Sequence, residues 1–157
     1  MKKVYIVLGI MLVILLPPFL FGLNYYYKHN TEFKVMQLNW KTNLPEHPIS
    51  EEELLDNSGG FLGDGDKIIK FTYGENQIEA LKNSLSWGDY ELDIFLKLNR
   101  LKKWYSTKDD EKFTELINSI IDNSKEYKFY AKTDTNDTLI LVWNIKTNEV
   151  LAFIEYM

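Results

Sequence analysis

The sequence contains no cysteine, and this absence excludes several kinds of chemistry at once. Disulfide bonds, thiolate nucleophiles, cysteine-based zinc sites and a lipid-modified N-terminal cysteine all require a thiol. Positive charge is also scarce, because 18 lysines and arginines stand against 23 aspartates and glutamates, for a formal net charge of −5. Nucleic-acid binding depends on clustered Lys and Arg that neutralise phosphates, so this balance argues against a nucleic-acid partner.

Histidine is rare as well, with only His29 and His47 in 157 residues. Neither lies in a recognisable pattern with a nucleophile and an orienting acid, so the sequence predicts no catalytic triad. Hydrophobic residues make up 45% of the chain and aromatic residues 15%, which is enough to build a packed core. The chain also lacks internal repeats and low-complexity linkers. We therefore expect one domain of ordinary size with an appendage.

The longest apolar stretch covers residues 4–23, contains no charge and follows Lys2 and Lys3. About 20 helical residues at about 1.5 Å each cross a hydrocarbon core of about 30 Å, so the stretch predicts a transmembrane helix in contact with the lipid bilayer. Three tyrosines at residues 25–27 fit an interfacial aromatic belt. Residues 1–30 are therefore predicted to be the uncleaved signal-anchor of a single-pass cell-membrane protein.

The orientation in the membrane follows from the charges on either side of this stretch. Lys2, Lys3 and the α-amino group lie before it, whereas all 23 acidic residues lie at or after Glu32. Because positive charge is retained in the cytoplasm, we expect a cytoplasmic N-terminus and an extracytoplasmic domain over residues 31–157. That domain has 15 basic and 23 acidic residues, a formal net charge of −8.

The N-terminal stretch is open to other interpretations. Pro17 and Pro18 predict a kink, and a shorter helix that ends at Leu16 before an interfacial or re-entrant stretch is one alternative. A cleaved signal peptide is another, which residues 21–23 disfavour because they form a poor cleavage site. A buried core helix is a third, which the absence of a polar stripe disfavours.

Residues 31–157 have the pattern of one α+β domain. Alternating or continuous apolar residues predict strands over residues 33–40, 67–73, 126–133, 138–145 and 149–157. Capping residues and helical spacing predict one helix that starts at Ser50 and others over residues 76–85 and 108–123, whereas residues 92–101 fit a helix or a strand. The last two strands are almost continuously apolar, so we expect them to be central or covered on both faces. The predicted fold class is α+β, with an N-terminal transmembrane helix before an antiparallel sheet of about four to five strands and two to three helices.

A glycine-rich stretch, GGFLGDGD at residues 59–66, precedes one of the predicted strands. A phosphate-binding loop opens a helix, whereas this one opens a strand and carries two carboxylates, so phosphate binding is disfavoured. The simplest interpretation is a tight turn whose glycines supply positive φ angles. Asp64 and Asp66 match the first and third positions of a calcium loop, although later positions break the pattern. A nonstandard calcium site built from Asp64, Asp66 and Asp56 is therefore the alternative.

Several segments also match a wider pattern: the loop 59-GGFLGDG-65, Trp87, the strand 127-YKFYAKTD-134 and the hairpin 139-LILVWNIKTNEVLAFIEY-156. In these segments the chain resembles a family of small uncharacterised proteins from Gram-positive bacteria, over roughly residues 33–157. Leu62 stands where that family is expected to have a histidine. The resemblance implies a domain of unknown function, and it implies no catalytic residue, substrate or cofactor.

These patterns favour a non-enzymatic binding protein over an enzyme. An acidic domain tethered outside the membrane is suited to a protein partner at the cell surface, and an immunity protein that intercepts a basic toxin is one concrete form. A divalent-metal-dependent surface enzyme that uses Asp64 and Asp66 is an alternative from another class. A structural subunit of a membrane complex, with the kinked N-terminal helix as its contact, is a third.

Overall fold

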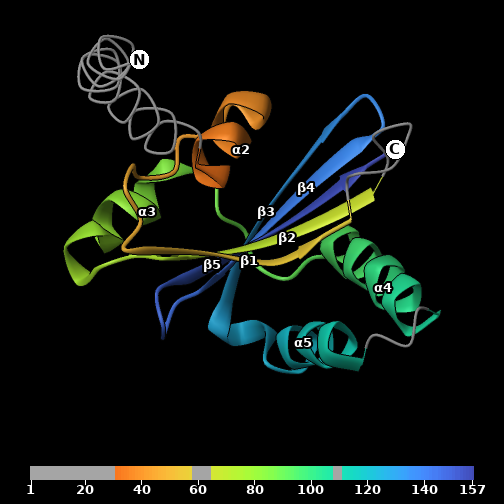
Figure 1. Ribbon diagram of the computed structural model, residues 1–157. Coiled ribbons are helices and arrows are strands. Elements are labelled where there is room, and N and C mark those ends of the chain that lie inside the picture. Colours follow the sequence, from red (N-terminus) through yellow and green to blue (C-terminus); the bar gives the residue numbers. More distant parts are fainter. Residues whose placement is uncertain (1–30, 58–64, 108–110) are drawn as a thin grey trace, which may run out of the picture.

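The computed structural model describes residues 31–57, 65–107 and 111–157, and it shows a five-stranded antiparallel sheet with helices on both faces (Figure 1). In chain order the elements are α2 (Glu32–Trp40), β1 (Ser50–Asp56), β2 (Gly65–Thr72), the 3-10 turn η1 (Glu75–Gln77), α3 (Ile78–Ser84), α4 (Leu92–Thr107), α5 (Glu111–Asp122), the 3-10 turn η2 (Ser124–Glu126), β3 (Tyr127–Asp134), β4 (Asp137–Asn144) and β5 (Glu149–Tyr156). The strand order is β1-β2-β5-β4-β3, so β1 and β3 are the edge strands. The described domain is α+β.

The sheet separates two hydrophobic cores, and strand β5 shows the division because successive strand side chains point to opposite faces. Val150, Ala152 and Ile154 belong to the core beneath α2 and α3. Leu151 and Phe153 belong to the core beneath α4 and α5 (Figure 1). Strands β4 and β5 are buried along most of their length and lie inside the sheet, so the prediction that they are central and covered on both faces is confirmed.

The connections place β2 beside the last strand of the chain. After β2 the chain forms α3, α4 and α5 and enters the sheet at the far edge as β3. Strands β3, β4 and β5 then form a meander that ends beside β2, which pairs with β5 from Gly65 opposite Tyr156 to Thr72 opposite Glu149. The predicted strand after the glycine loop and the predicted C-terminal hairpin are therefore confirmed. The two predicted helices after β2 are α3 and α5, and the undecided segment is α4.

The prediction of a strand over residues 33–40 is wrong, because this segment is helix α2. Over so short a length the apolar residues fit both the strand period of about 2 residues and the helical period of about 3.6 residues. The helical period places Phe33 and Trp40 together against the sheet. The Thr31 hydroxyl accepts a hydrogen bond from the Lys34 N–H at 3.3 Å and caps the first turn. Contact with the sheet, which a local pattern does not contain, decides between the two periods.

The prediction of a helix that starts at Ser50 is also wrong, because Ser50–Asp56 form strand β1. A serine followed by three glutamates is a local signal for a helix start. Pairing with strand β2 outweighs this local helix signal, because β1 forms an antiparallel ladder with the edge of β2. The same arrangement lets Leu54 and Leu55 pack against the core beneath α4 and α5.

The fold class predicted from the sequence differs from the structure, which is α+β with no membrane-spanning helix among the described residues. The predicted signal-anchor, residues 1–30, lies outside the described residues. Within residues 31–57, 65–107 and 111–157, no helix is long and apolar enough to cross a membrane. These ranges contain four α-helices rather than two or three. The membrane-anchored class is therefore not retained.

Candidate functional site

The predicted calcium loop is only partly within the described residues. Asp64 lies outside them, whereas Asp66 is a buried residue of β2 that pairs with Glu155 of β5. Glu155 contacts Arg100 of α4, and residues paired across strands share a face, so Asp66 lies on the α4 face. Asp56 lies on the opposite face, and no group of three His, Asp or Glu residues in the described ranges is placed to hold a metal ion. The calcium site therefore stays a prediction.

The glycine loop is described only at its last two residues. Gly65 begins β2 with φ 150°, a backbone conformation that side chains disfavour. This agrees with the prediction that glycine supplies a positive φ angle where the loop enters the strand.

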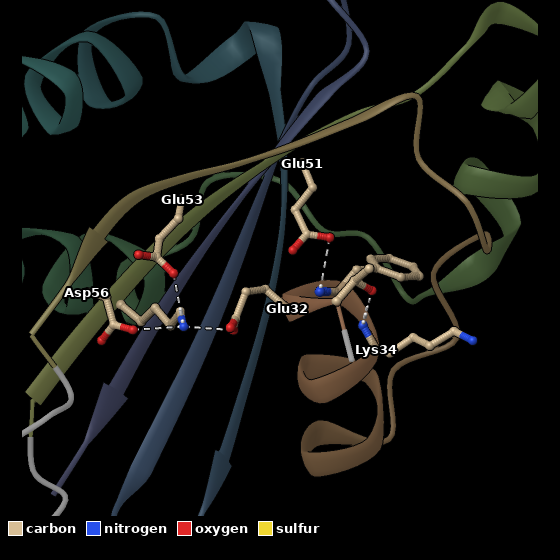
Figure 2. Close-up of polar contacts among 8 residues, drawn as sticks. Glu32, Lys34, Glu51, Glu53 and Asp56 are labelled. Carbon is tan, nitrogen blue, oxygen red and sulfur yellow. Dashed lines mark hydrogen bonds and ion pairs between the residues drawn. The ribbon is translucent and has the colours of Figure 1, made fainter. Parts of the chain in front are cut away.

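The most unusual polar cluster in the described residues surrounds Lys67, on the face of the sheet that carries α2. The Lys67 Nζ lies 2.7 Å from Glu32 Oε2, 2.9 Å from Asp56 Oδ2 and 3.2 Å from Glu53 Oε2 (Figure 2). The lysine side chain is only 8% exposed. Three carboxylates from α2 and β1 therefore converge on one ammonium group of β2.

A bulge in β1 brings two of these carboxylates to the same face. Side chains alternate along a regular strand, so Glu53 and Asp56, three positions apart, would point to opposite faces. The pairing with β2 shifts between Glu53 and Leu55, which gives β1 one extra residue there. Glu53 and Asp56 consequently both reach Lys67, while Leu54 and Leu55 both pack toward α4 and α5.

The carboxylates hold Lys67 in its charged form. Burial by itself lowers the pKa of the Lys67 ammonium, but hydrogen bonds to Glu32 and Asp56, with the charge of Glu32 and a bond to Glu53, outweigh it. The pKa of Lys67 is therefore raised above its ordinary value, and the group stays protonated at neutral pH. A lysine in this state is a counter-ion and not a general base.

Helix α2 begins directly over this cluster. The Glu51 carboxylate of β1 accepts a hydrogen bond from the Phe33 N–H at 3.3 Å (Figure 2). Burial raises the pKa of Glu51, and hydrogen bonds from the first-turn amides of α2 oppose that rise. A carboxylate near a helix N-terminus interacts favourably with the helix dipole. Glu51 and Glu32 thus fix the start of α2 to the edge of the sheet, while Figure 2 shows the Lys34 side chain directed away from the cluster.

The other face of β1 has a smaller cluster of the same kind. The Lys70 Nζ lies 2.6 Å from Glu52 Oε2 and 3.9 Å from Glu149 Oε1. The hydrogen bond to Glu52 raises the pKa of Lys70.

We call the residues of the two clusters, together with Glu51, the acidic edge. The acidic edge consists of Glu32, Glu51, Glu52, Glu53, Asp56, Glu149, Lys67 and Lys70. Its six carboxylates and two lysines leave four net negative charges. Since residues 31–157 have a formal charge of −8, half of that surplus lies on β1 and on the parts of α2, β2 and β5 beside it.

Both faces of the sheet are hollowed beside β1. On the α2 side a cavity of about 270 Å³ includes Phe33, Glu46, Ile49 and Glu51 in its lining. On the α5 side a cavity of about 550 Å³ is lined by apolar and charged residues, among them Glu52, Leu54, Lys112, Glu115 and Glu149. The edge strand therefore runs between two open hollows, each of which contains carboxylates.

Sequence reasoning missed the acidic edge because the signal was ambiguous. The three glutamates at residues 51–53 fit the first turn of a helix as well as a strand. The one available signal was Lys67 itself, a charged residue directly before the apolar Ile68 and Ile69, whose acidic partners come from two other segments.

Comparison of the chain with protein-family models, with curated proteins and with solved structures finds no match. The acidic edge therefore has to be interpreted from its own chemistry.

Proposed function

We propose that this domain is a binding module that captures a basic protein partner on its acidic edge. The observation that supports the proposal is the concentration of half the negative surplus of residues 31–157 on and beside β1, at one edge of the sheet. The two lysines within the acidic edge are paired with carboxylates, and four net negative charges remain after their positive charge is counted.

The exposed carboxylates allow this surface to attract a basic partner through the solvent. Glu52 and Glu53 have side chains that are 57% and 47% exposed, so part of the negative charge faces solvent beside the buried counter-ion. Charge complementarity of this kind accelerates encounter and disfavours partners of the same sign. A charged Lys67 and clustered carboxylates, with no nucleophile beside a base among them, suit electrostatic binding better than catalysis.

The proposal is tested by measuring the affinity of the full chain for octalysine by calorimetry at low and at physiological salt. The variant with Glu51→Gln, Glu52→Gln and Glu53→Gln removes three charges from the acidic edge. Three ion pairs with octalysine at about 0.5 kcal/mol each amount to about 1.5 kcal/mol, so we expect octalysine to bind this variant about tenfold more weakly.

The matched control removes three exposed charges elsewhere, by Glu75→Gln, Glu91→Gln and Asp122→Asn. We expect this control to bind octalysine with nearly the affinity of the parent protein. Equal losses in the two variants would show that octalysine responds to net charge alone, and would contradict a binding site at the acidic edge. Circular dichroism of both variants checks that the fold is retained.

A further inference from the structure

We infer that an extended segment of the basic partner binds by adding to β1 as a sixth strand of the sheet. This inference rests on the proposed function and gives its mode of recognition. Strand addition supplies affinity through backbone hydrogen bonds and specificity through alternate side chains.

The two edges of the sheet differ in whether their backbone is covered. At the β3 edge, the Phe129 N–H donates to the Gly88 carbonyl at 2.9 Å, and the Gly88 N–H donates back to the Phe129 carbonyl at 2.8 Å. At the other edge β1 has β2 as its single neighbour in the described part of the sheet. The backbone of residues 50–54 that faces away from β2 thus has no strand partner within the described ranges.

A hollow lies on each face of the sheet beside β1, and the side chains of an added strand would point to these two faces. Successive side chains of such a strand alternate between the two faces of the sheet. On one face they would lie beside Glu46 and Glu51, and on the other beside Glu52, at the outer end of the cavity that extends inward over β2 and β5. Carboxylates outnumber lysines in both linings, because Lys34 lies in the first and Lys70 and Lys112 lie in the second. This balance favours lysine or arginine at positions of both parities.

The same charges decide against a second copy of this chain as the occupant. Pairing of two β1 strands would set glutamates opposite or diagonal to glutamates, and like charges at those positions are destabilising. Charged edge residues are a common device against edge-to-edge association. A basic segment of another protein would be attracted by the same glutamates. The bulge after Glu53 limits regular pairing with such a segment to residues 50–53.

The experiment compares three peptides of eight residues in the order Lys-Lys-Val-Val-Lys-Lys-Val-Val, with blocked ends, so that lysine occupies positions of both parities. The first is unmodified. The second carries N-methyl groups on four consecutive central backbone amides, which removes the donors needed for strand pairing. The third carries four methyl groups on the lysine Nζ atoms instead, so it matches the second in composition and charge. Affinities for the full chain are measured by calorimetry, and amide hydrogen exchange of residues 50–54 is followed in parallel.

We expect the unmodified and the Nζ-methylated peptides to bind with similar affinity, and the backbone-methylated peptide to lose at least about tenfold. We also expect exchange of the β1 amides to slow when the unmodified peptide binds. Equal binding of all three peptides with no change in exchange overturns strand addition and leaves the acidic edge as a charge-only binding site. Absence of binding by all three overturns the proposed function as well.

Discussion

The two edges of the sheet use charge in opposite ways. At the β3 edge each lysine holds a neighbouring segment: Lys128 Nζ lies 2.6 Å from Asp89 Oδ1, and Lys132 Nζ donates to the Trp40 carbonyl at 2.7 Å. At the β1 edge five carboxylates contact two lysines, and the Glu51 carboxylate is a sixth beside them. One edge is closed by contacts between single residues, whereas the other keeps an excess of one sign beside open hollows. The difference separates an edge whose lysines are engaged by single partners within the domain from one whose excess charge is suited to a partner.

The largest expected effect comes from removing the central cation of the acidic edge. Lys67→Met leaves three carboxylates close together without a counter-ion, and breaking a largely buried ion pair from one side is strongly destabilising. We expect the free energy of unfolding in urea to fall by about 2–3 kcal/mol, somewhat less than for a fully buried group because the carboxylates are partly exposed.

Lys70→Met is the control for that change, because Lys70 is more exposed and has fewer close carboxylates. We expect a loss of about 1 kcal/mol. If both substitutions cost the same, Lys67 has no special role and the contrast between the two clusters fails.

A smaller effect should appear in the alkaline range. The folded pKa of Lys67 is raised, so its stabilisation is complete below the unfolded value of about 10.4 and is lost as the pH rises through the folded value. We expect the parent protein to lose up to about 1 kcal/mol more than Lys67→Met between pH 9 and pH 11. Burial also raises the pKa of Tyr73 and of Tyr156, and because both proteins contain these phenols, their common loss cancels to first order.

Parallel urea titrations of the parent and of Lys67→Met across that pH range provide the measurement. If the free energy of unfolding changed with pH by the same amount in the two proteins, protonation of Lys67 would not be linked to folding, contrary to what its geometry indicates.

The smallest effect is expected at the β3 edge. Lys128→Met removes an ion pair with Asp89, whose side chain is 84% exposed, and exposed pairs contribute little. We expect a change of no more than about 0.5 kcal/mol in the free energy of unfolding and no change in octalysine affinity. A larger loss in stability at this edge than at Lys67 would reverse the comparison between the two edges.

The C-terminal half of the sheet was predictable because its signals are strong and consistent. The residues of β4 and β5 are nearly all apolar, and the turn between them contains Lys146, Thr147 and Asn148. No competing helical pattern exists in these segments, so the local pattern and the tertiary fold agree.

The acidic edge was not predictable because its parts have conflicting local signals. Residues 33–40 fit a strand and became a helix, and the segment that starts at Ser50 fits a helix and became a strand. Each is short enough for tertiary contacts to override its propensity. The bulge that directs Asp56 toward Lys67 depends on pairing with β2, which no local pattern records.

The sequence by itself determined the excess of negative charge, the absence of thiol chemistry and the apolar strands that build the centre of the sheet. These properties depend on composition and on the spacing of neighbouring residues. Only the tertiary structure decided where the charge gathers, because Glu32, Glu53 and Asp56 meet Lys67 through strand pairing, a bulge and the docking of α2. Contacts between segments distant in the sequence arise from burial and pairing over the whole domain, and a local pattern does not contain them.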